Sequence, residues 1–272
     1  NWNLGQGFSP IGNGLSTFTG SFDGMGHTIS NLVINRPGTN YVGLFGYGSG
    51  STISNIGMVG GSVTGGSWTG GLIGQNSGII HNAYATGAVT GFVRAGGLVG
   101  ENSNGANIIN AYASGAVTGN NEVGGLAGSN HGSISTSYAS SDVVSIFTSV
   151  DGVLVGGLVG GNWGAINDAY STGSVTGNGR VGGLVGQNNS GIINNVYSTG
   201  AVSGNSYVGG LVGSNSGTAV TNSYWDITVN GALPGFGYGT GGATGLTTAQ
   251  MMSQANFTGF DFTPGTGSWF MI

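Results

Sequence analysis

The feature that most constrains this chain is an internal repeat of about 27 residues. A sequence close to VGGLVGxN returns along the chain, and its leucine marks each copy. These leucines are Leu44, Leu72, Leu98, Leu126, Leu158, Leu184 and Leu211. The intervals between them are 28, 26, 28, 32, 26 and 27 residues. A regular period of this length is typical of proteins in which equivalent segments stack on one another.

Other residues recur in register with these leucines. Four residues after each leucine from Leu72 onward stands an asparagine: Asn76, Asn102, Asn130, Asn162, Asn188 and Asn215. A second column consists of Tyr84, Tyr112, Tyr138, Tyr170, Tyr197 and Tyr224, to which we assign Met58 in the earliest copy. The 32-residue interval is a 26-residue copy with six residues inserted near residues 144–153.

Glycine content decides what such a unit can build. The chain has 62 glycines in 272 residues, and each glycine in a helix costs about 1 kcal/mol relative to alanine. Short alternating or β-branched segments separated by Gly, Asn and Ser favour strands and turns instead. We therefore predict an all-β, three-sided parallel β-solenoid with about 27 residues per coil and seven to eight coils. A β-propeller blade would need about 40–45 residues.

The same reasoning divides the chain into three parts. Residues 1–42 are expected to form an irregular N-terminal strand and first coil, and residues 43–224 the regular solenoid. Residues 225–272 lack the period and are expected to form a C-terminal cap or assembly segment. Within that segment, Thr247 to Gln250 is a capping box that predicts a short helix. The asparagine column is expected to form a hydrogen-bonded ladder at a corner, with a left-handed backbone.

Composition excludes several classes of function. The chain has three Lys and Arg residues against eight acids, too few to neutralise the phosphates of a nucleic acid. It contains no run of 18 apolar residues, which a membrane-spanning helix would need. Cysteine is absent, which removes disulfides and thiolate metal sites. The acids fall in different columns, and His81 and His131 lack a second ligand at metal-binding spacing. We therefore expect no catalytic residues, no metal and no cofactor.

The repeat also resembles a known family. The consensus GGLVGxNxGxIxNxYxTGxVTG resembles the GLUG motif of filamentous-haemagglutinin-like bacterial exoproteins and adhesins. The segments FDGMGHTISNLVI and SYWD…GLTTAQMM…FDF look like those that open and close such regions. The resemblance implies a non-catalytic structural or adhesive protein, located outside the cell or on the bacterial surface. It also implies an export signal that is removed and is not present in this chain.

One variable column is the candidate binding surface. The position four residues before each leucine holds Asn40, Trp68, Arg94, Glu122, Leu154, Arg180 and Tyr207. Variation of this kind indicates an outward stripe in which Trp68, Arg94, Glu122, Arg180 and Tyr207 contact a glycan or a protein, or are simply solvated. Arg94 and Glu122 are expected to pair across coils. The apolar inserted residues Ile146, Phe147 and Val150 either fold onto the rod or contact a partner.

Three other functions stay open at this point. The solenoid ends are strand templates, so the chain is a candidate for end-to-end or lateral self-association into a filament. Two columns of small hydroxyls could order water as an ice-binding face does: Thr86, Ser114, Ser140, Thr172 and Thr199, and Thr90, Thr118, Thr176 and Ser203. A polysaccharide-active β-helix enzyme would need its acids clustered on one face.

Overall fold

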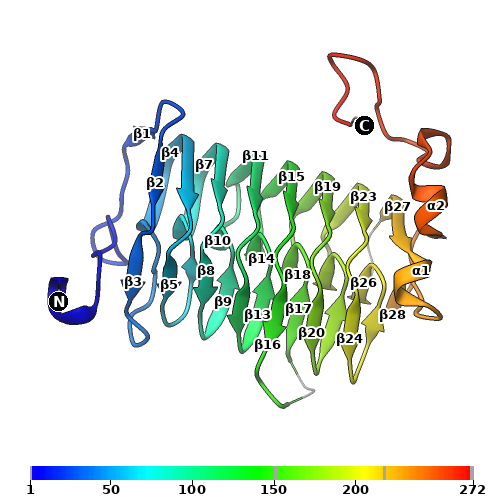
Figure 1. The fold of residues 1–272 in the computed structure, drawn as a ribbon, viewed down its shortest axis with the longest axis horizontal. Coiled ribbons are helices and arrows are strands. Elements are labelled where there is room, and N and C mark those ends of the chain that lie inside the picture. Colours follow the sequence, from blue (N-terminus) through cyan, green and yellow to red (C-terminus); the bar gives the residue numbers. More distant parts are fainter. Residues whose placement is uncertain (1, 150–151, 217–218, 270–272) are drawn as a thin grey trace.

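The chain winds into a rod of stacked coils. The structure is a computed structural model that describes residues 2–149, 152–216 and 219–269. It is an all-β parallel solenoid of about 8 turns with about 27 residues per turn, as the repeat predicts. Figure 1 shows the coils side by side along the long axis of the molecule, with the first residues at one end of the rod and residues 227–256 at the other.

The strands form three parallel sheets within the described residues. Sheet 1 contains β1 (Ser21–Asp23), β2 (Thr28–Ser30), β4 (Phe45–Val59), β7 (Ile73–Ala85), β10 (Val99–Asn102), β11 (Asn107–Ala113), β14 (Ala127–Asn130), β15 (Ser133–Ala139), β18 (Val159–Asn162), β19 (Ala165–Ser171), β22 (Val185–Asn188), β23 (Ile192–Ser198), β26 (Val212–Asn215), β27 (Val220–Asp226), β28 (Phe236–Tyr238) and β29 (Ala243–Leu246). Sheet 2 contains β3 (Val33–Asn35), β5 (Ser62–Thr64), β8 (Ala88–Thr90), β12 (Val117–Gly119), β16 (Val143–Ser145), β20 (Val175–Gly177) and β24 (Val202–Gly204). Sheet 3 contains β6 (Thr69–Gly70), β9 (Val93–Gly96), β13 (Asn121–Gly124), β17 (Leu154–Gly156), β21 (Arg180–Gly182) and β25 (Val208–Gly209).

A middle coil has four strands rather than one for each of three sides. Strands β9, β10, β11 and β12 make one such coil, and sheet 1 contributes two of them. The two meet at the corner that carries the asparagine column. In β4 and β7 the chain passes through this corner as one continuous strand. Sheet 1 is therefore folded lengthwise along the rod.

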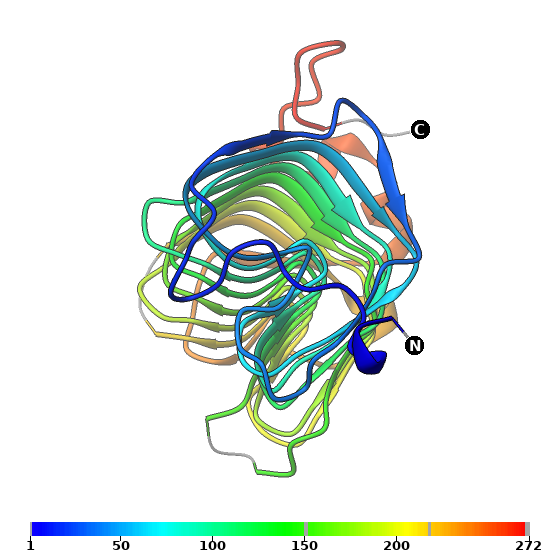
Figure 2. The same ribbon diagram turned by 90° about the vertical axis from the view of Figure 1, so that its left-hand side faces the viewer.

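Equivalent residues lie directly above one another. Strand β10 pairs in parallel with β14, with Val99 opposite Ala127 and Asn102 opposite Asn130. Strand β11 pairs with β7, with Tyr112 opposite Tyr84. Seen along the rod in Figure 2, the coils superpose, and the described parts of the segment between β16 and β17, residues 146–149 and 152–153, project from their outline. The constant period thus produces columns of like side chains.

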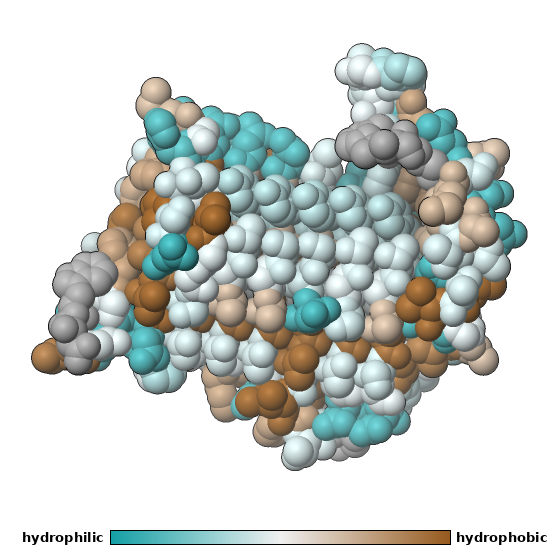
Figure 3. All heavy atoms as spheres, in the orientation of Figure 1, coloured by the Kyte–Doolittle hydropathy of each residue, from teal (hydrophilic) through white to brown (hydrophobic). Residues whose placement is uncertain are grey.

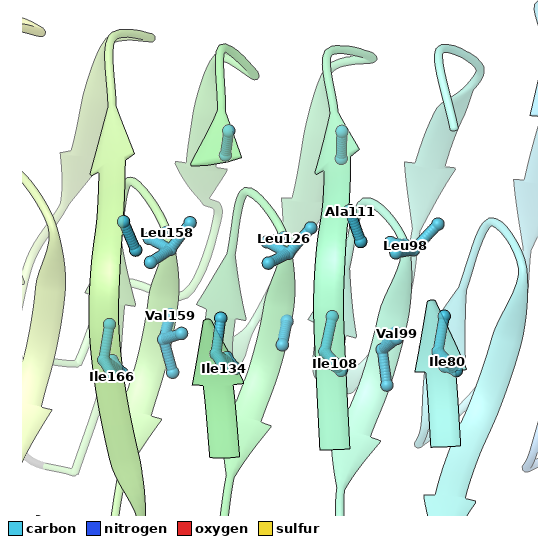
Figure 4. Close-up of a cluster of buried hydrophobic side chains, with 14 of the residues drawn as sticks. Ile80, Leu98, Val99, Ile108, Ala111, Leu126, Ile134, Leu158, Val159 and Ile166 are labelled. Atoms are coloured by element: carbon cyan, nitrogen blue, oxygen red, sulfur yellow. The ribbon is translucent and has the colours of Figure 1, made fainter. Parts of the chain in front are cut away.

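Apolar columns fill the inside of the rod. Figure 4 shows Leu98, Leu126 and Leu158 in one row and the equivalent isoleucines of sheet 1 in another. These leucines have no exposed surface. A second cluster, made of residues such as Val117 and Val123, fills the space between sheets 2 and 3. Burial of these columns is the main favourable contribution to folding.

The paired glycines before each leucine allow the sheets to approach closely. A Cβ atom on Gly124 would lie 2.0 Å from the carbonyl oxygen of Ala127 and 2.7 Å from the amide nitrogen of Gly160. No side chain fits there without moving backbone. The glycines of the motif are therefore required by packing.

The asparagine column forms an internal ladder. Each asparagine donates from Nδ2 to Oδ1 of the next, at 2.8–2.9 Å from Asn76 through Asn215. All of these residues are buried. The expected left-handed backbone was wrong, because their φ angles are not positive. The left-handed asparagines belong to a second, outer column that includes Asn82 (φ 53°) and Asn110 (φ 50°).

The N-terminal end of the rod is covered by the residues before the first coil. A 3-10 helix, η1 (Trp2–Gly5), precedes Gly7, which pairs antiparallel with Ile34 of β3. Phe8 N donates to the carbonyl of Val33. The first strand of sheet 2 is thus hydrogen-bonded on its outer side.

The C-terminal end is covered in a different way. Helix α1 (Ile227–Asn230) replaces the next strand of sheet 2. Asn230 accepts from Val202 N (2.9 Å) and donates to Gly200 O (3.1 Å), which satisfies backbone groups at the edge of β24. Helix α2 (Thr248–Met251) begins at the Thr247 capping box, and η2 (Gln254–Asn256) follows it. Strand pairing continues to β29, inside the segment assigned from the sequence as a cap.

Candidate binding cleft

The variable column runs along the rod at the start of sheet 3. In the first coil its member is Tyr41 and not Asn40, because Val42 pairs with Thr69 and so places Tyr41 opposite Trp68. The first copy has one residue fewer before its leucine, which shifted the expected alignment. Five of these residues have left-handed backbones: Tyr41 (φ 59°), Trp68 (57°), Arg94 (59°), Glu122 (51°) and Tyr207 (45°). Such backbones are unfavourable for residues other than glycine and often occur at functional sites.

Side chains of this column contact one another across coils. The rings of Tyr41 and Trp68 stack with centroids 4.8 Å apart, and the Arg94 guanidinium carbon lies 5.2 Å from the Trp68 ring. Arg94 Nε donates to Glu122 Oε2 at 2.9 Å, so the expected ion pair forms. These contacts join four coils into one continuous surface.

Glu101 binds Arg94 from a neighbouring column. This side chain is only 8% exposed, and each carboxylate oxygen accepts from two donors. Oε2 accepts from Arg94 Nη1 (2.6 Å) and Trp68 Nε1 (2.9 Å), and Oε1 from Gln75 Nε2 (3.0 Å) and Ser103 Oγ (3.1 Å). A buried carboxylate needs such compensation. Glu101 therefore fixes the position of Arg94.

Sequence reasoning missed Glu101 because it lies on β10, outside the variable column. Only the turn between β9 and β10 brings it to Arg94. The equivalent residues of the adjacent coils are Gln75 and Ser129. The one sequence signal for Glu101 is its carboxylate, because the equivalent residues of the two adjacent coils are neutral.

A cleft of about 470 Å³ opens beside this cluster, lined by Arg94, Glu101, Asn104, His131 and Trp163. The rings of His131 and Trp163 stack with centroids 4.7 Å apart and planes 7° from parallel. From the sequence, His131 was considered only as a metal ligand, and Trp163 was not singled out. Each follows a buried ladder asparagine, Asn130 or Asn162, which fixes the backbone at this corner.

The remaining stripe residues lie farther along the rod. The Arg180 guanidinium carbon is 5.7 Å from the Tyr207 ring, and Tyr207 contacts Tyr238 edge-on at 5.5 Å. They form a second group that does not line the cleft.

The inserted loop between β16 and β17 exposes its apolar side chains. Ile146 is 63% and Phe147 43% exposed. The backbone is held by Asn178, whose Nδ2 donates to Phe147 O at 3.0 Å. Val150 lies outside the described residues.

The tyrosine column forms a second ordered surface. The rings of Tyr84, Tyr112, Tyr138, Tyr170 and Tyr197 stack at 4.7–4.9 Å with planes within 4° of parallel. The assignment of Met58 to this column was wrong, because Gly57 pairs with Tyr84 and Met58 with Ala85. Figure 3 shows how outward side chains of the rod line up in regular rows of neutral to hydrophilic character.

The C-terminal segment folds back over part of this ladder. Trp269 lies 6.0 Å from the Tyr170 ring and 5.6 Å from the Tyr197 ring, and its Nε1 donates to Asp168 Oδ1. Burial raises the pKa of Tyr170 to about 12 and that of Tyr197 further. Burial likewise raises the pKa of Tyr112 and Tyr138. The segment thus shields the end of the ladder from water.

The fold and its ladders define a class, the parallel β-solenoid repeat proteins. Within that class, the family model of the GLUG motif matches residues 93–118, 151–176 and 204–230. The chain therefore carries a GLUG-motif repeat region, as the sequence predicted.

Two relatives share parts of the repeat. Halomucin of Haloquadratum walsbyi is 45% identical over 89 residues, which are 31% of this chain and 1% of halomucin. A protein of Evansella cellulosilytica, whose name describes a Gly-rich membrane protein, is 37% identical over 82 residues, 29% of this chain and 10% of that protein. The matched stretches span only a small part of either relative.

A solved structure shares the fold. It is a Bacteroides ovatus protein described as an immunoglobulin A1 protease, with a TM-score of 0.53 and 19% identity. The match covers 85% of this chain and 70% of that one. In the part of the chain that the structure describes, no helix has the length and apolar character to cross a membrane, and no three His, Asp or Glu side chains converge as metal ligands would.

Proposed function

We propose that the chain is an extracellular, non-catalytic β-solenoid of a surface protein, and that it acts as a rigid adhesive element. The observation that carries this proposal is the stripe beside the cleft, where Tyr41, Trp68, Arg94 and Glu122 from four coils are held in fixed positions on a repetitive scaffold. Regular ladders give rigidity, and variable outward positions give contacts. The two relatives are named halomucin and a Gly-rich membrane protein, and these names support a place at the cell surface.

The non-catalytic part of the proposal rests on how the acids are used. Glu101 and Glu122 both bind Arg94, and Glu101 accepts two further side-chain donors on its other oxygen. General acid–base catalysis needs a carboxyl group that is free to exchange a proton with a substrate. Acids committed to holding an arginine are better suited to binding.

Ice binding has weaker support. The second hydroxyl column is interrupted by Val144, which lies between Thr118 and Thr176. Thr86 Oγ1 also accepts a hydrogen bond from Gly60 N and is tied to the neighbouring coil. Thermal hysteresis and recrystallisation inhibition should therefore be absent.

Cell-surface location and adhesion can be tested together. Antibodies against the chain should label intact producing cells, and external protease should remove the label. Beads coated with the purified protein should bind to the surfaces these cells colonise, above beads coated with a protein of equal charge. Labelling that appears only after lysis, or beads that do not adhere, would contradict the proposal.

A further inference from the structure

We infer that the cleft lined by Arg94, Glu101, Asn104, His131 and Trp163 is a binding site for uncharged sugar units of an extracellular polysaccharide. This inference rests on the proposed function, because it names the ligand of the same surface. Its basis is the set of unpaired polar groups, the local charge and the aromatic wall of the cleft.

Unpaired hydrogen-bonding groups converge on the cleft. Arg94 uses Nε and Nη1 for its two carboxylates, and no group in the described residues bonds to Nη2. Likewise, the side-chain amide of Asn104, the ring nitrogens of His131 and the Trp163 Nε1 have no protein partner in residues 2–149, 152–216 and 219–269. Sugar hydroxyls donate and accept at once, so they match such a mixture of donors and acceptors.

The charge of the cluster favours a neutral ligand. Glu101 and Glu122 carry two negative charges against the single positive charge of Arg94. The guanidinium is already compensated, so a sugar carboxylate would meet net negative charge. Uncharged hydroxyls meet no such repulsion.

The aromatic wall of the cleft depends on a local departure from the repeat at Gly161. Trp163 folds across Gly161, where a Cβ atom would lie 2.4 Å from Cζ3 of the indole. Gly161 is the partner of Ser129 in the column that also contains Glu101. Its lack of a side chain lets the indole reach toward Leu154, into the line of the stripe. An indole beside polar groups is a common feature of pockets for small ligands.

The site is preorganised for such a ligand. Arg94 is held at two of its nitrogens, and the corner that carries His131 and Trp163 is fixed by the buried asparagine ladder. Little side-chain freedom is lost on binding. A cleft of about 470 Å³ also has the size of a small-molecule site rather than of a protein interface.

The test is calorimetric titration of the full chain with mannohexaose, cellohexaose and laminarihexaose, with hexagalacturonate as the acidic counterpart. At least one neutral hexasaccharide should bind, and hexagalacturonate should bind more weakly. Trp163→Asn should weaken binding about tenfold or more. Asparagine is tolerated at this place, since Asn189 occupies it in the next coil. Tyr238→Ser, a change of an exposed aromatic outside the cleft, should leave binding unchanged.

The outcomes separate the inference from the proposed function. Equal or tighter binding of hexagalacturonate, or neutral binding that survives Trp163→Asn in a folded variant, overturns the assignment of this site. No binding of any hexasaccharide by a protein that still adheres to the surfaces its producing cells colonise overturns the ligand class and points to a protein partner. If antibodies do not label intact producing cells and coated beads do not adhere, the proposed function itself is overturned.

Discussion

Single polar residues inside the rod act through their neighbours in the column. Asn130 accepts from Asn102, donates to Asn162, and also donates to the carbonyl oxygen of Ala165 at 3.3 Å. It has no exposed surface. Buried polar groups are costly when they lose a partner and contribute to a unique packing when they keep it.

Asn130→Ala should therefore destabilise the chain more than loss of one average hydrogen bond. Asn162 Oδ1 would lose its side-chain donor in a dry environment, and Asn102 Nδ2 would keep only its longer bonds to Ala106 O (3.4 Å) and Ser133 O (3.2 Å). We expect a loss of about 2–4 kcal/mol. Urea unfolding followed by circular dichroism measures it. Asn110→Asp on the outer, exposed ladder is the matched control and should cost less than about 1 kcal/mol. Equal effects of the two changes would refute a special role of the inner ladder.

The two arginines of the stripe should also differ in how much each contributes to the free energy of unfolding. Arg94→Met leaves Glu101 buried without its cation, so we expect a loss of about 2 kcal/mol in the free energy of unfolding. Arg180→Met removes only a contact with the exposed Tyr207 ring and should cost well under 1 kcal/mol. Thermal unfolding of both variants at two salt concentrations distinguishes them. A neutral effect of Arg94→Met would mean that the cluster does not hold the site in place.

At the scale of elements, the C-terminal segment and the tyrosine ladder stabilise each other. Phe257 contacts the Tyr224 ring at 4.9 Å, and Trp269 contacts Tyr170 and Tyr197. The segment has no period of its own, so its position depends on these aromatic contacts.

This contact makes stability depend on pH in the alkaline range. The folded chain holds the proton of Tyr170 to about pH 12, whereas an unfolded tyrosine loses it near the ordinary pKa of 10.0. Stability from this group is complete below pH 10 and is lost as pH rises toward 12, because the unfolded chain binds fewer protons there. Tyrosinate absorbance during an alkaline titration should show late-titrating tyrosines. In Trp269→Ser they should titrate earlier, and an unchanged titration would show that the segment does not cover the ladder.

The sequence predicted elements where the period applies and failed where it does not. The columns of Asn102 and Asn130 follow from the repeat, since constant spacing forces equal residues into register. The ion pair between Glu101 and Arg94 depends on the shape of the turn between β9 and β10. The meeting of Trp269 with Asp168 joins residues 101 positions apart through a segment without periodicity. The period predicts neither contact, and the sequence marks only Glu101, as a carboxylate between neutral equivalents.

At the scale of the whole molecule, the two ends decide whether rods stack. Sheet 2 is hydrogen-bonded at its first strand by residues 6–8 and at its last by Asn230. Free strand edges are the usual templates for association, and here the first strand of this sheet and the start of the last have such partners. We therefore favour a monomeric adhesive rod over an end-to-end filament.

Removal of residues 1–20 should change this state. The shortened chain exposes the outer edge of β3, so we expect it to associate as its concentration rises, while the full chain stays monomeric. Light scattering coupled to size exclusion measures both, and circular dichroism verifies that the shortened chain is folded. Fibres formed by the full chain in electron micrographs would favour the filament instead.

The most direct test of the account is a crystal structure of the full chain with a bound neutral hexasaccharide. We predict a sugar ring beside the Trp163 indole, with a hydroxyl within hydrogen-bonding distance of Arg94 Nη2. Sugar bound along the uncovered tyrosines Tyr84 and Tyr112, with the cleft empty at saturating ligand, would contradict it.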